Sequence, residues 1–236
     1  MTFARVDFSS LTNNSNTLTY KVYKNNVQIA TGTVIVNLED GGLPSGVIFN
    51  NVQNIATEVK VTIDTSEITD FSNMFYQCGQ LTTVPLFDTS SATAINNMFY
   101  YAVNLVNLPN FDFSSVRGAT YSFASCSKLV DVTNITFGPF TTAQYLFNNC
   151  YALEKVPALN FGNVASQGAM NNVFQNCSKL THFGGLQNVK FSYSLSSSPL
   201  LTHDSLINCI NGLTDLTGET AQTLTLGDKN LAKLTE

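Results

Sequence analysis

The sequence carries little charge, and most of what it carries is negative. Charged residues make up 11% of the chain, against about a quarter of an average soluble protein. The 11 Lys and Arg residues and the 16 Asp and Glu residues give a net charge of −5. No basic cluster is present, so the positive surface that nucleic-acid binding requires is missing. The composition therefore excludes a nucleic-acid-binding protein.

Long hydrophobic runs are also missing. No stretch approaches the roughly 20 apolar residues that a membrane-spanning helix requires, so no membrane insertion is expected. Residues 1–7 lack a basic segment followed by an apolar core, and we expect no signal peptide. The chain is expected either to bypass that export route or to be a piece whose signal has been removed.

Recognisable catalytic and cofactor motifs are absent. The sequence contains no G-x-S-x-G, no H-E-x-x-H and no glycine-rich nucleotide-binding pattern. Its two histidines, His182 and His203, accompany no nucleophile in a known motif, and we interpret both as solvated surface residues. The cysteines form no C-x-x-C pair, which argues against a zinc site. We predict a non-enzymatic protein with no catalytic residues, no metal and no cofactor.

Hydrophobic residues are plentiful, and they repeat. They make up 44% of the chain, with 17 Phe and 9 Tyr, so a substantial core can be buried. Aligned positions recur every 24 residues, with one step of 27, and Ala102 fills the Cys position of one repeat. The framework residues are Phe75, Phe99, Phe123, Phe147, Phe174, Leu81, Leu105, Leu129, Leu153, Leu180, Cys78, Cys126, Cys150 and Cys177.

Each repeat has the pattern of one short strand and one helical or 3₁₀ turn. Residues 81–86 place apolar side chains at Leu81, Val84 and Leu86, which matches the strand signature of leucine-rich repeats, and the period is in their range. Residues 95–100 predict a short helix. Because no unit can bury its apolar face alone, neighbouring units must stack. The sequence predicts an α/β solenoid, a leucine-rich-repeat-like right-handed coil of about five 24-residue repeats.

Two sets of repeated side chains have competing interpretations. We interpret the Cys series as buried thiols that pack as small hydrophobes, because Ala replaces Cys once; disulfides between neighbouring coils are the alternative. Asp64, Asp88 and Asp112 recur at the turn after each strand. We interpret them as Asx turns, with a calcium-binding ladder as the alternative. Gly138 and Gly162 are expected to take this position in later repeats.

Residues 73–90 carry a motif of known type, N-M-F-x-x-C-x-x-L-x-x-V-P-x-F-D-T-S. This motif resembles the BspA-type leucine-rich repeats of bacterial surface proteins and their phage-encoded relatives. The resemblance covers about residues 57–195. It implies an adhesin or another cell-surface interaction protein, or a structural protein of a phage particle. Because no signal peptide is expected here, the virion setting comes first.

The two ends of the chain carry no repeat. Residues 1–56 predict a small β domain or cap, 57–195 the leucine-rich repeat solenoid, and 196–236 a C-terminal capping segment. The expected N-terminal strands cover residues 4–8, 18–23, 28–38 and 47–52, with a hairpin turn at 24–26. In the C-terminal segment we expect a helix capped by Thr202 and ending near Asn211, a strand over 223–226 and a short helix from Lys229.

A varied row of side chains is expected to face outward between the framework residues of the strands. It consists of Thr83, Asn107, Asp131, Lys155 and His182. A rigid scaffold with varied side chains is how repeat proteins make protein-binding or glycan-binding surfaces; simple solvation of these residues is the alternative. A set of tyrosines adds an aromatic patch or belongs to the core: Tyr100, Tyr101, Tyr121, Tyr145 and Tyr151.

These observations predict a non-catalytic binding or structural module. The first expectation is a phage virion structural or host-attachment protein, and the alternative is a bacterial cell-surface adhesin fragment that binds host protein or glycan. The expected location is the virion, the extracellular space or the cell surface. The expected partners are a protein or glycan ligand on a cell surface, or other virion proteins. Exposed end coils would favour a homo-oligomer.

Overall fold

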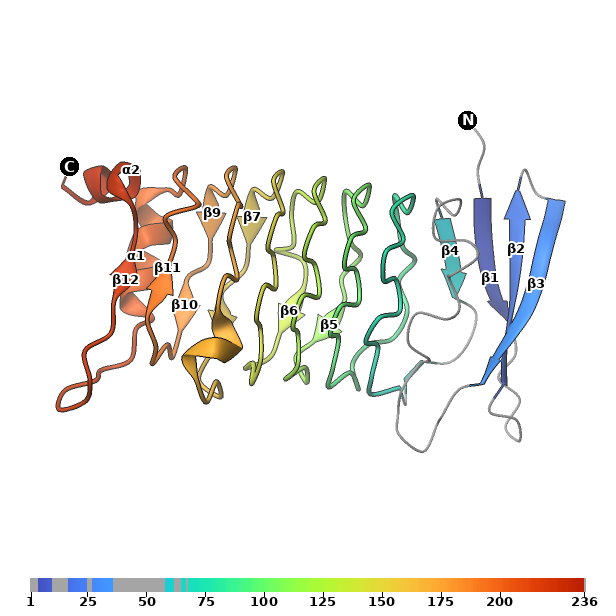
Figure 1. The fold of residues 1–236 in the computed structure, drawn as a ribbon, viewed down its shortest axis with the longest axis horizontal. Helices are drawn as coiled ribbons and strands as arrows, with labels where there is room; N and C mark the ends of the chain where they lie inside the picture. Colours follow the sequence, from blue (N-terminus) through green and yellow to red (C-terminus); the bar gives the residue numbers. More distant parts are fainter. Residues whose placement is uncertain are drawn as a thin grey trace.

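The chain winds into a row of stacked coils with a β-sheet at one end and helices at the other (Figure 1). The structure is a computed structural model that describes residues 4–9, 17–24, 27–35, 58–61, 65–66 and 68–235. We call one repeat of 24 or 27 residues a coil. Outside the N-terminal sheet, the described strands of the chain are two residues long and form small parallel pairs.

The N-terminal sheet contains four strands in the order β3-β2-β1-β4. They are β1 (Ala4–Ser9), β2 (Thr17–Lys24), β3 (Val27–Ile35) and β4 (Glu58–Val61). The first three overlap the strands expected at 4–8, 18–23 and 28–38, of which residues 36–38 lie outside the described residues, and Lys24 pairs with Val27 across the expected hairpin. The strand expected at 47–52 lies outside the described residues.

Strand β4 connects this sheet to the coils. It lies just past the expected boundary at residue 56, and it pairs in parallel with β1, whereas β1, β2 and β3 pair antiparallel. Residues 58–61 precede residues 82–85 by one 24-residue repeat, so β4 occupies the strand position of the first coil. The sheet therefore covers the open end of the stack by extending its strand side.

The strand segments of the coils are shorter than expected. Residues 81–89 form no regular strand. The described strand pairs are β5 (Asp112–Phe113) with β6 (Thr136–Phe137), β7 (Lys155–Val156) with β9 (His182–Phe183), and β8 (Leu159–Asn160) with β10 (Leu186–Gln187). Proline recurs within these segments, and a proline has no N–H to donate to a ladder. Pro85, Pro109 and Pro157 occupy equivalent positions in three coils.

The helix expected at residues 95–100 is absent, and this prediction is wrong. The segment is a chain of turns: Met98 N–H donates to Ile95 O at 3.0 Å, and Tyr100 N–H donates to Asn97 O at 3.1 Å. The amides between them donate to the next coil, Phe99 N–H to Ser122 O at 2.8 Å. Asn97 has a φ of 55°, a left-handed conformation that ends any α-helical run and suits the third residue of a type II turn. These backbone groups therefore join coils instead of closing a helix.

Each coil repeats this arrangement with two left-handed residues four positions apart. Asparagine tolerates this conformation better than most residues, and it occupies several of the positions. The pairs are Asn73 and Gln77, Asn97 and Tyr101, Tyr121 and Ser125, Tyr145 and Asn149, and Asn172 and Asn176. We call this side of each coil the turn side, and the side that carries β4, β7 and β9 the strand side.

Phenylalanine rings fill the centre of the stack. The five aligned rings are at most 2% exposed. Consecutive ring centroids lie 5.2, 5.5, 5.3 and 5.7 Å apart and the rings are nearly parallel. The aligned Leu and Cys residues are buried around them, together with Ala102. One continuous apolar column therefore runs through the coils.

The cysteine side chains are free thiols that lie inside this core. Cys126, Cys150 and Cys177 each donate a hydrogen bond to a carbonyl oxygen of the preceding coil, at 3.0–3.1 Å. Burial raises the pKa of Cys78, Cys177 and Cys209 to about 12. The thiols are therefore held protonated and act as packing groups with a weak hydrogen bond.

The aspartates at the strand ends form local turns. Asp88 Oδ1 accepts a hydrogen bond from Ser90 N–H at 2.9 Å, and Asp112 Oδ1 accepts one from Ser114 N–H at 2.9 Å. The same geometry recurs where Asn160 Oδ1 accepts from Gly162 N–H, so the turn position in that coil belongs to Asn160. Asp112 pairs with Thr136, so Gly138 does not take the aspartate position either. Asp64 lies outside the described residues.

The C-terminal segment covers the last coil. Helix α1 (His203–Asn211) begins at Thr202, whose Oγ1 accepts a hydrogen bond from Ser205 N–H. Ser205 Oγ in turn accepts from Phe183 N–H at 2.9 Å, so α1 lies where the strand of a further coil would lie. Strand β11 (Tyr193–Ser194) precedes α1 and pairs with β12 (Leu224–Thr225), which follows it. The last two elements are α2 (Asp228–Leu231) and η4 (Ala232–Leu234), which continues from it.

The last elements are fixed to the stack by side chains. Asn230 is buried and its amide donates to Ser198 O and Leu226 O, both at 3.0 Å. Lys233 Nζ donates to Pro199 O at 3.0 Å and to Leu201 O at 2.6 Å. These contacts satisfy carbonyl groups that have no further coil to accept from.

Candidate binding surface

The residues of the outward row lie in register on the strand side. Asn107 pairs with Asp131, Asp131 with Lys155, and Lys155 with His182, in each case in parallel. Asp131 is half-buried and the other three are exposed, as is Thr83 one repeat earlier. The structure therefore brings four of the five expected residues into one continuous ladder, which we call the strand-side row, with Thr83 preceding it.

Backbone hydrogen bonds hold the row in place. Glu154 N–H donates to Val130 O at 2.8 Å, and His182 N–H donates to Glu154 O at 3.0 Å. Buried framework residues bracket Asp131 in the sequence, because Leu129 and Val132 are both fully buried. The row side chains thus stand on a surface whose backbone is fixed on both faces.

An ion pair crosses two coils in the middle of the row. Lys155 Nζ lies 3.7 Å from Asp131 Oδ2. Burial by itself raises the pKa of Asp131, but the hydrogen bonds from Thr133 Oγ1 (2.6 Å) and Thr133 N–H (2.8 Å) and the attraction of Lys155 lower it overall. Asp131 is therefore ionised near neutral pH, and the row places an anion and a cation side by side between an amide and an imidazole.

A hollow of about 350 Å³ lies at the end of the row, beside α1. His182 and Asp204 line it from opposite elements, the strand β9 and the first turn of α1. Gly184 forms part of its wall, and a Cβ there would lie 2.3 Å from Ala158 N, so only glycine fits. His182 Nδ1 is 2.8 Å from Thr181 Oγ1, and His203 Nδ1 is 3.6 Å from Asp204 Oδ1, so both histidines lie at the exposed surface as expected.

The tyrosines gather on the turn side. Tyr76 and Tyr100 stack with centroids 5.3 Å apart, Tyr121 meets Tyr100 edge-on at 5.7 Å, and Tyr121 and Tyr145 stack at 4.6 Å and 5°. Each of these four rings contacts at least one other tyrosine ring, and all four side chains are half-buried. Tyr101 is half exposed, and Tyr151 is half exposed and hydrogen-bonded to Asn149. The expected aromatic patch is thus a row of contacting tyrosine rings on the turn side, and among the described ring contacts none involves Tyr151.

The described part of the chain offers no ready metal centre. Within it, no three His, Cys, Asp or Glu side chains come together as they would around a metal ion. The same residues contain no helix of the length and hydrophobicity that a bilayer crossing requires.

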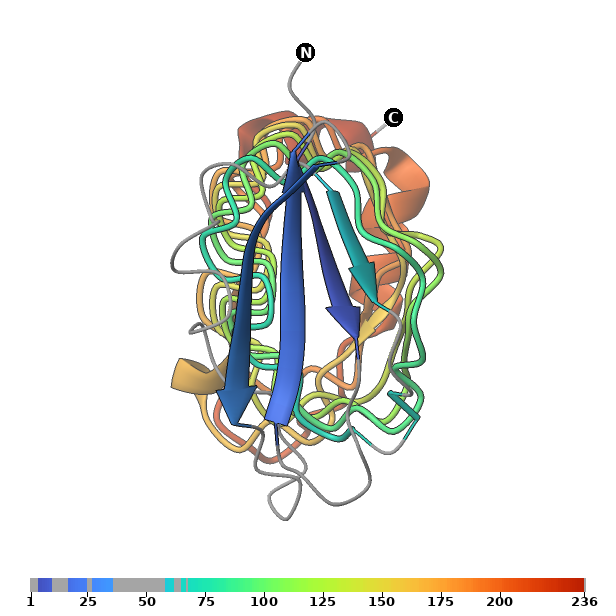
Figure 2. The same ribbon diagram turned by 90° about the vertical axis from the view of Figure 1, so that its right-hand side faces the viewer.

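A second hollow escaped prediction from the sequence. It lies beside the 3₁₀ helix η3 (Gln167–Met170), which protrudes from the coils on the side opposite α1 (Figure 2). The available signal was the spacing of 27 residues, instead of 24, between Phe147 and Phe174. A longer repeat in an otherwise regular stack must leave the coil as a bulge, and bulges of this kind form functional surfaces on repeat proteins.

Comparisons with known proteins give one similarity. No curated protein and no solved structure matches the chain. Thr83 and the row residues Asn107, Asp131 and Lys155 lie within the region that a family model matches, whereas His182, η3, α1 and both hollows lie mainly beyond it. Over residues 46–160 the chain is similar to the family described as Mycoplasma protein of unknown function, DUF285.

Proposed function

We propose that the protein is a non-catalytic binding module that presents the strand-side row to a protein or glycan partner. In this proposal the stacked coils form a right-handed, leucine-rich-repeat-like solenoid of the BspA type, and the sheet and α1 cover its ends. The observation that carries the proposal is the parallel register of Asn107, Asp131, Lys155 and His182. Four chemically different side chains are held at one-coil spacing on a fixed backbone.

The row suits recognition because its geometry is set before a partner arrives. Hydrogen bonds between coils fix each backbone segment, so little backbone entropy is lost on binding. An ionised carboxylate and an ammonium group next to exposed polar side chains give a surface that selects partners by charge and hydrogen bonding. Neighbouring buried residues leave the outward positions free to differ without cost to the core.

Two biological settings fit such a module. The first is a phage virion, where the protein is a structural or host-attachment component and its partners are other virion proteins or a receptor on the host cell. The second is a bacterial cell surface, where the protein is an adhesin. The similarity to a family of Mycoplasma proteins supports the second setting, because that family is bacterial.

Antibody labelling in the electron microscope separates the settings. Label on phage heads or tails supports the virion role, and label on bacterial envelopes supports the adhesin role. Binding itself is tested with purified, fluorescently labelled protein. This protein is mixed with particles or cells that the antibody does not stain, because these do not already carry the protein. We expect saturable binding that Lys155→Glu weakens about tenfold or more.

The matched control is Lys229→Glu, which makes the same charge change on an exposed residue of α2 away from the row. We expect this control to bind like the unmodified protein. Equal binding by both variants would exclude the strand-side row as the contact surface. Turnover of a glycan or protein substrate that one carboxylate substitution abolishes would contradict a non-catalytic role.

A further inference from the structure

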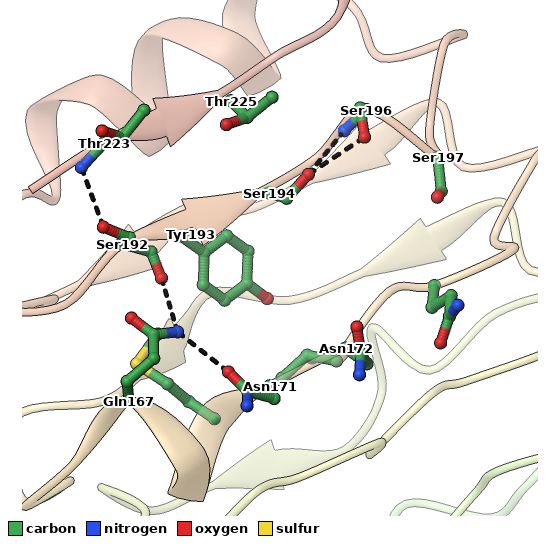
Figure 3. A pocket seen from close by; sticks show the side chains of 13 residues that line it. Gln167, Asn171, Asn172, Ser192, Tyr193, Ser194, Ser196, Ser197, Thr223 and Thr225 are labelled. Carbon is green, nitrogen blue, oxygen red and sulfur yellow. Dashed lines mark hydrogen bonds between the residues drawn. The ribbon is translucent and has the colours of Figure 1, made fainter.

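The hollow beside η3 is a product of one irregular repeat. The extra residues of this coil form η3, and the chain returns to the stack at Asn171 and Asn172. Strands β11 and β12 form the facing wall. The hollow has a volume of about 370 Å³, within the range of small-molecule sites, roughly 300–1,000 Å³. Figure 3 shows Ser194 and Ser196 on one side, Asn171 and Asn172 on the other, and the Tyr193 ring between them.

Hydrogen bonds order the walls of the hollow. The Gln167 amide donates to Ser192 O and to Asn171 Oδ1, both at 2.9 Å, and so ties η3 to β11. Ser192 Oγ accepts from Thr223 N–H at 3.1 Å, which ties β11 to the segment before β12. Ser194 Oγ and Ser196 Oγ lie 3.0 Å apart. These contacts hold the walls in position without a ligand.

The lining is polar and uncharged. Ten of the 13 lining residues are Asn, Gln, Ser or Thr, and none is Asp, Glu, Lys, Arg or His. Three of their side chains, Asn172, Ser197 and Thr225, make no hydrogen bond to another described residue. The remaining lining residues are Tyr193, Met170 and Val173, which are almost fully buried, and the buried Tyr193 hydroxyl has no hydrogen-bond partner among the described residues.

We infer that the hollow beside η3 binds a neutral saccharide. A pyranose ring offers uncharged hydroxyl groups around its edge, which match the amide and hydroxyl groups that line the hollow. An anionic or cationic ligand would find no counter-charge in the lining. An apolar ligand would cover the free amide and hydroxyls of Asn172, Ser197 and Thr225 without replacing their bonds to water.

This inference rests on the proposed binding function and names a ligand class for a second surface. The hollow and the strand-side row lie on different sides of the stack, as the positions of η3 and α1 in Figure 2 show. A charged, varied row suits a macromolecular partner, whereas the uncharged hollow suits one sugar unit. The two proposed binding sites can therefore be tested in separate experiments, and the result for one does not decide the other.

Saturation-transfer difference NMR on the full chain tests the inference. The probes are glucose, galactose, mannose, N-acetylglucosamine and N-acetylgalactosamine, each at about 10 mM because single sugar units bind weakly. Glucuronate and N-acetylneuraminate serve as charged comparators. We expect saturation transfer to at least one neutral sugar and none to the charged ones.

Two substitutions locate the binding without disturbing the fold. Asn172→Gly removes the amide at a φ of 57°, which glycine adopts freely. Thr225→Val replaces a hydroxyl by a methyl group of the same shape. We expect the double variant to lose about tenfold or more in affinity. The control is Thr136→Val, the same chemical change on an exposed residue of β6 outside both the hollow and the strand-side row, which we expect to leave sugar binding unchanged.

The outcomes separate this inference from the proposed function. A neutral sugar that binds the unmodified protein and Thr136→Val but not the double variant supports the hollow as its site. Absence of transfer to every neutral sugar, stronger transfer to the charged sugars, or equal binding by the double variant overturns the inference. If particles or cells are still bound through the strand-side row, the proposed function survives that result.

Discussion

Truncation of Phe123 to alanine tests the stacking of the core most directly. The Phe123 side chain is fully buried and its ring lies between Phe99 and Phe147, with centroid distances of 5.5 and 5.3 Å and interplanar angles of 15° and 13°. Replacing a buried Phe by Ala costs about 3–5 kcal/mol of stability. Two aromatic pairs are lost, each contributing about 0.5–1.5 kcal/mol beyond the buried area. We therefore expect the upper part of that range, about 5 kcal/mol.

Equilibrium unfolding in urea measures this loss, as the change in midpoint multiplied by the slope of the transition. The chain has no tryptophan, so tyrosine fluorescence and far-ultraviolet circular dichroism serve as probes. Leu86→Ala is the control, because Leu86 is 64% exposed and its truncation should change stability by less than about 0.5 kcal/mol. A cost below about 1 kcal/mol for Phe123→Ala, or a cost equal to that of Leu86→Ala, would refute the ring column.

Further predictions concern the thiols, the ion pair and the turns. Cys126→Ala should lower the free energy of unfolding in urea by only about 1 kcal/mol, because Ala102 fills the same position in another coil. A thiol reagent should leave Cys126 of the native protein unmodified and react with it only after denaturation, since burial raises the pKa of this thiol. The pKa of Asp131 is lowered in the folded state, so its carboxylate stabilises the protein above the unfolded pKa of about 4 and this contribution is lost as pH falls through the lower folded pKa. Asp131→Asn should therefore lower the urea midpoint at pH 7 and have no such effect at pH 2; equal midpoints of the two proteins at pH 7 would contradict the role of Asp131. Ser125 has a φ of 63°, so Ser125→Gly should raise the free energy of unfolding by about 0.5–1 kcal/mol and Ser125→Val should lower it by more; thermal unfolding that ranks Val above Gly would contradict the left-handed turn.

The repeat pattern predicted the buried column but not the backbone that carries it. Positions such as Phe123 and Leu129 could be placed inside because a 24-residue period in apolar residues has one simple explanation, the stacking of equivalent units. The turn side was assigned to a helix because residues 95–100 have apolar spacing that turns share with helices. What decides between them is the left-handed conformation of Asn97 and Tyr101. The recurring asparagines were the available signal for this conformation, but tyrosine rarely adopts it, so Tyr101 could not be assigned to it from the sequence.

The outward row could be predicted, whereas the hollows could not. Row residues follow from the repeat, because each lies between two framework positions, as Asp131 lies between the buried Leu129 and Val132. The hollow beside η3 depends on where an insertion folds and on contacts between residues far apart in the chain, such as Gln167 with Ser192. Thr202 and the helix after it were predicted because N-capping is a local effect.

The parallel pairing of β1 with β4 sets the order in which the chain acquires its structure during synthesis. Strands β1, β2 and β3 connect through short links and can form their antiparallel sheet early, but the partner of Arg5 in β4, Glu58, leaves the ribosome much later. Each later coil then forms hydrogen bonds with the coil directly before it. For example, Thr93 Oγ1 donates to Thr69 O, which lies 24 residues earlier in the chain. Contacts this local allow fast, vectorial growth. We therefore expect the N-terminal sheet to form first and to act as the template on which the later coils fold, one after another.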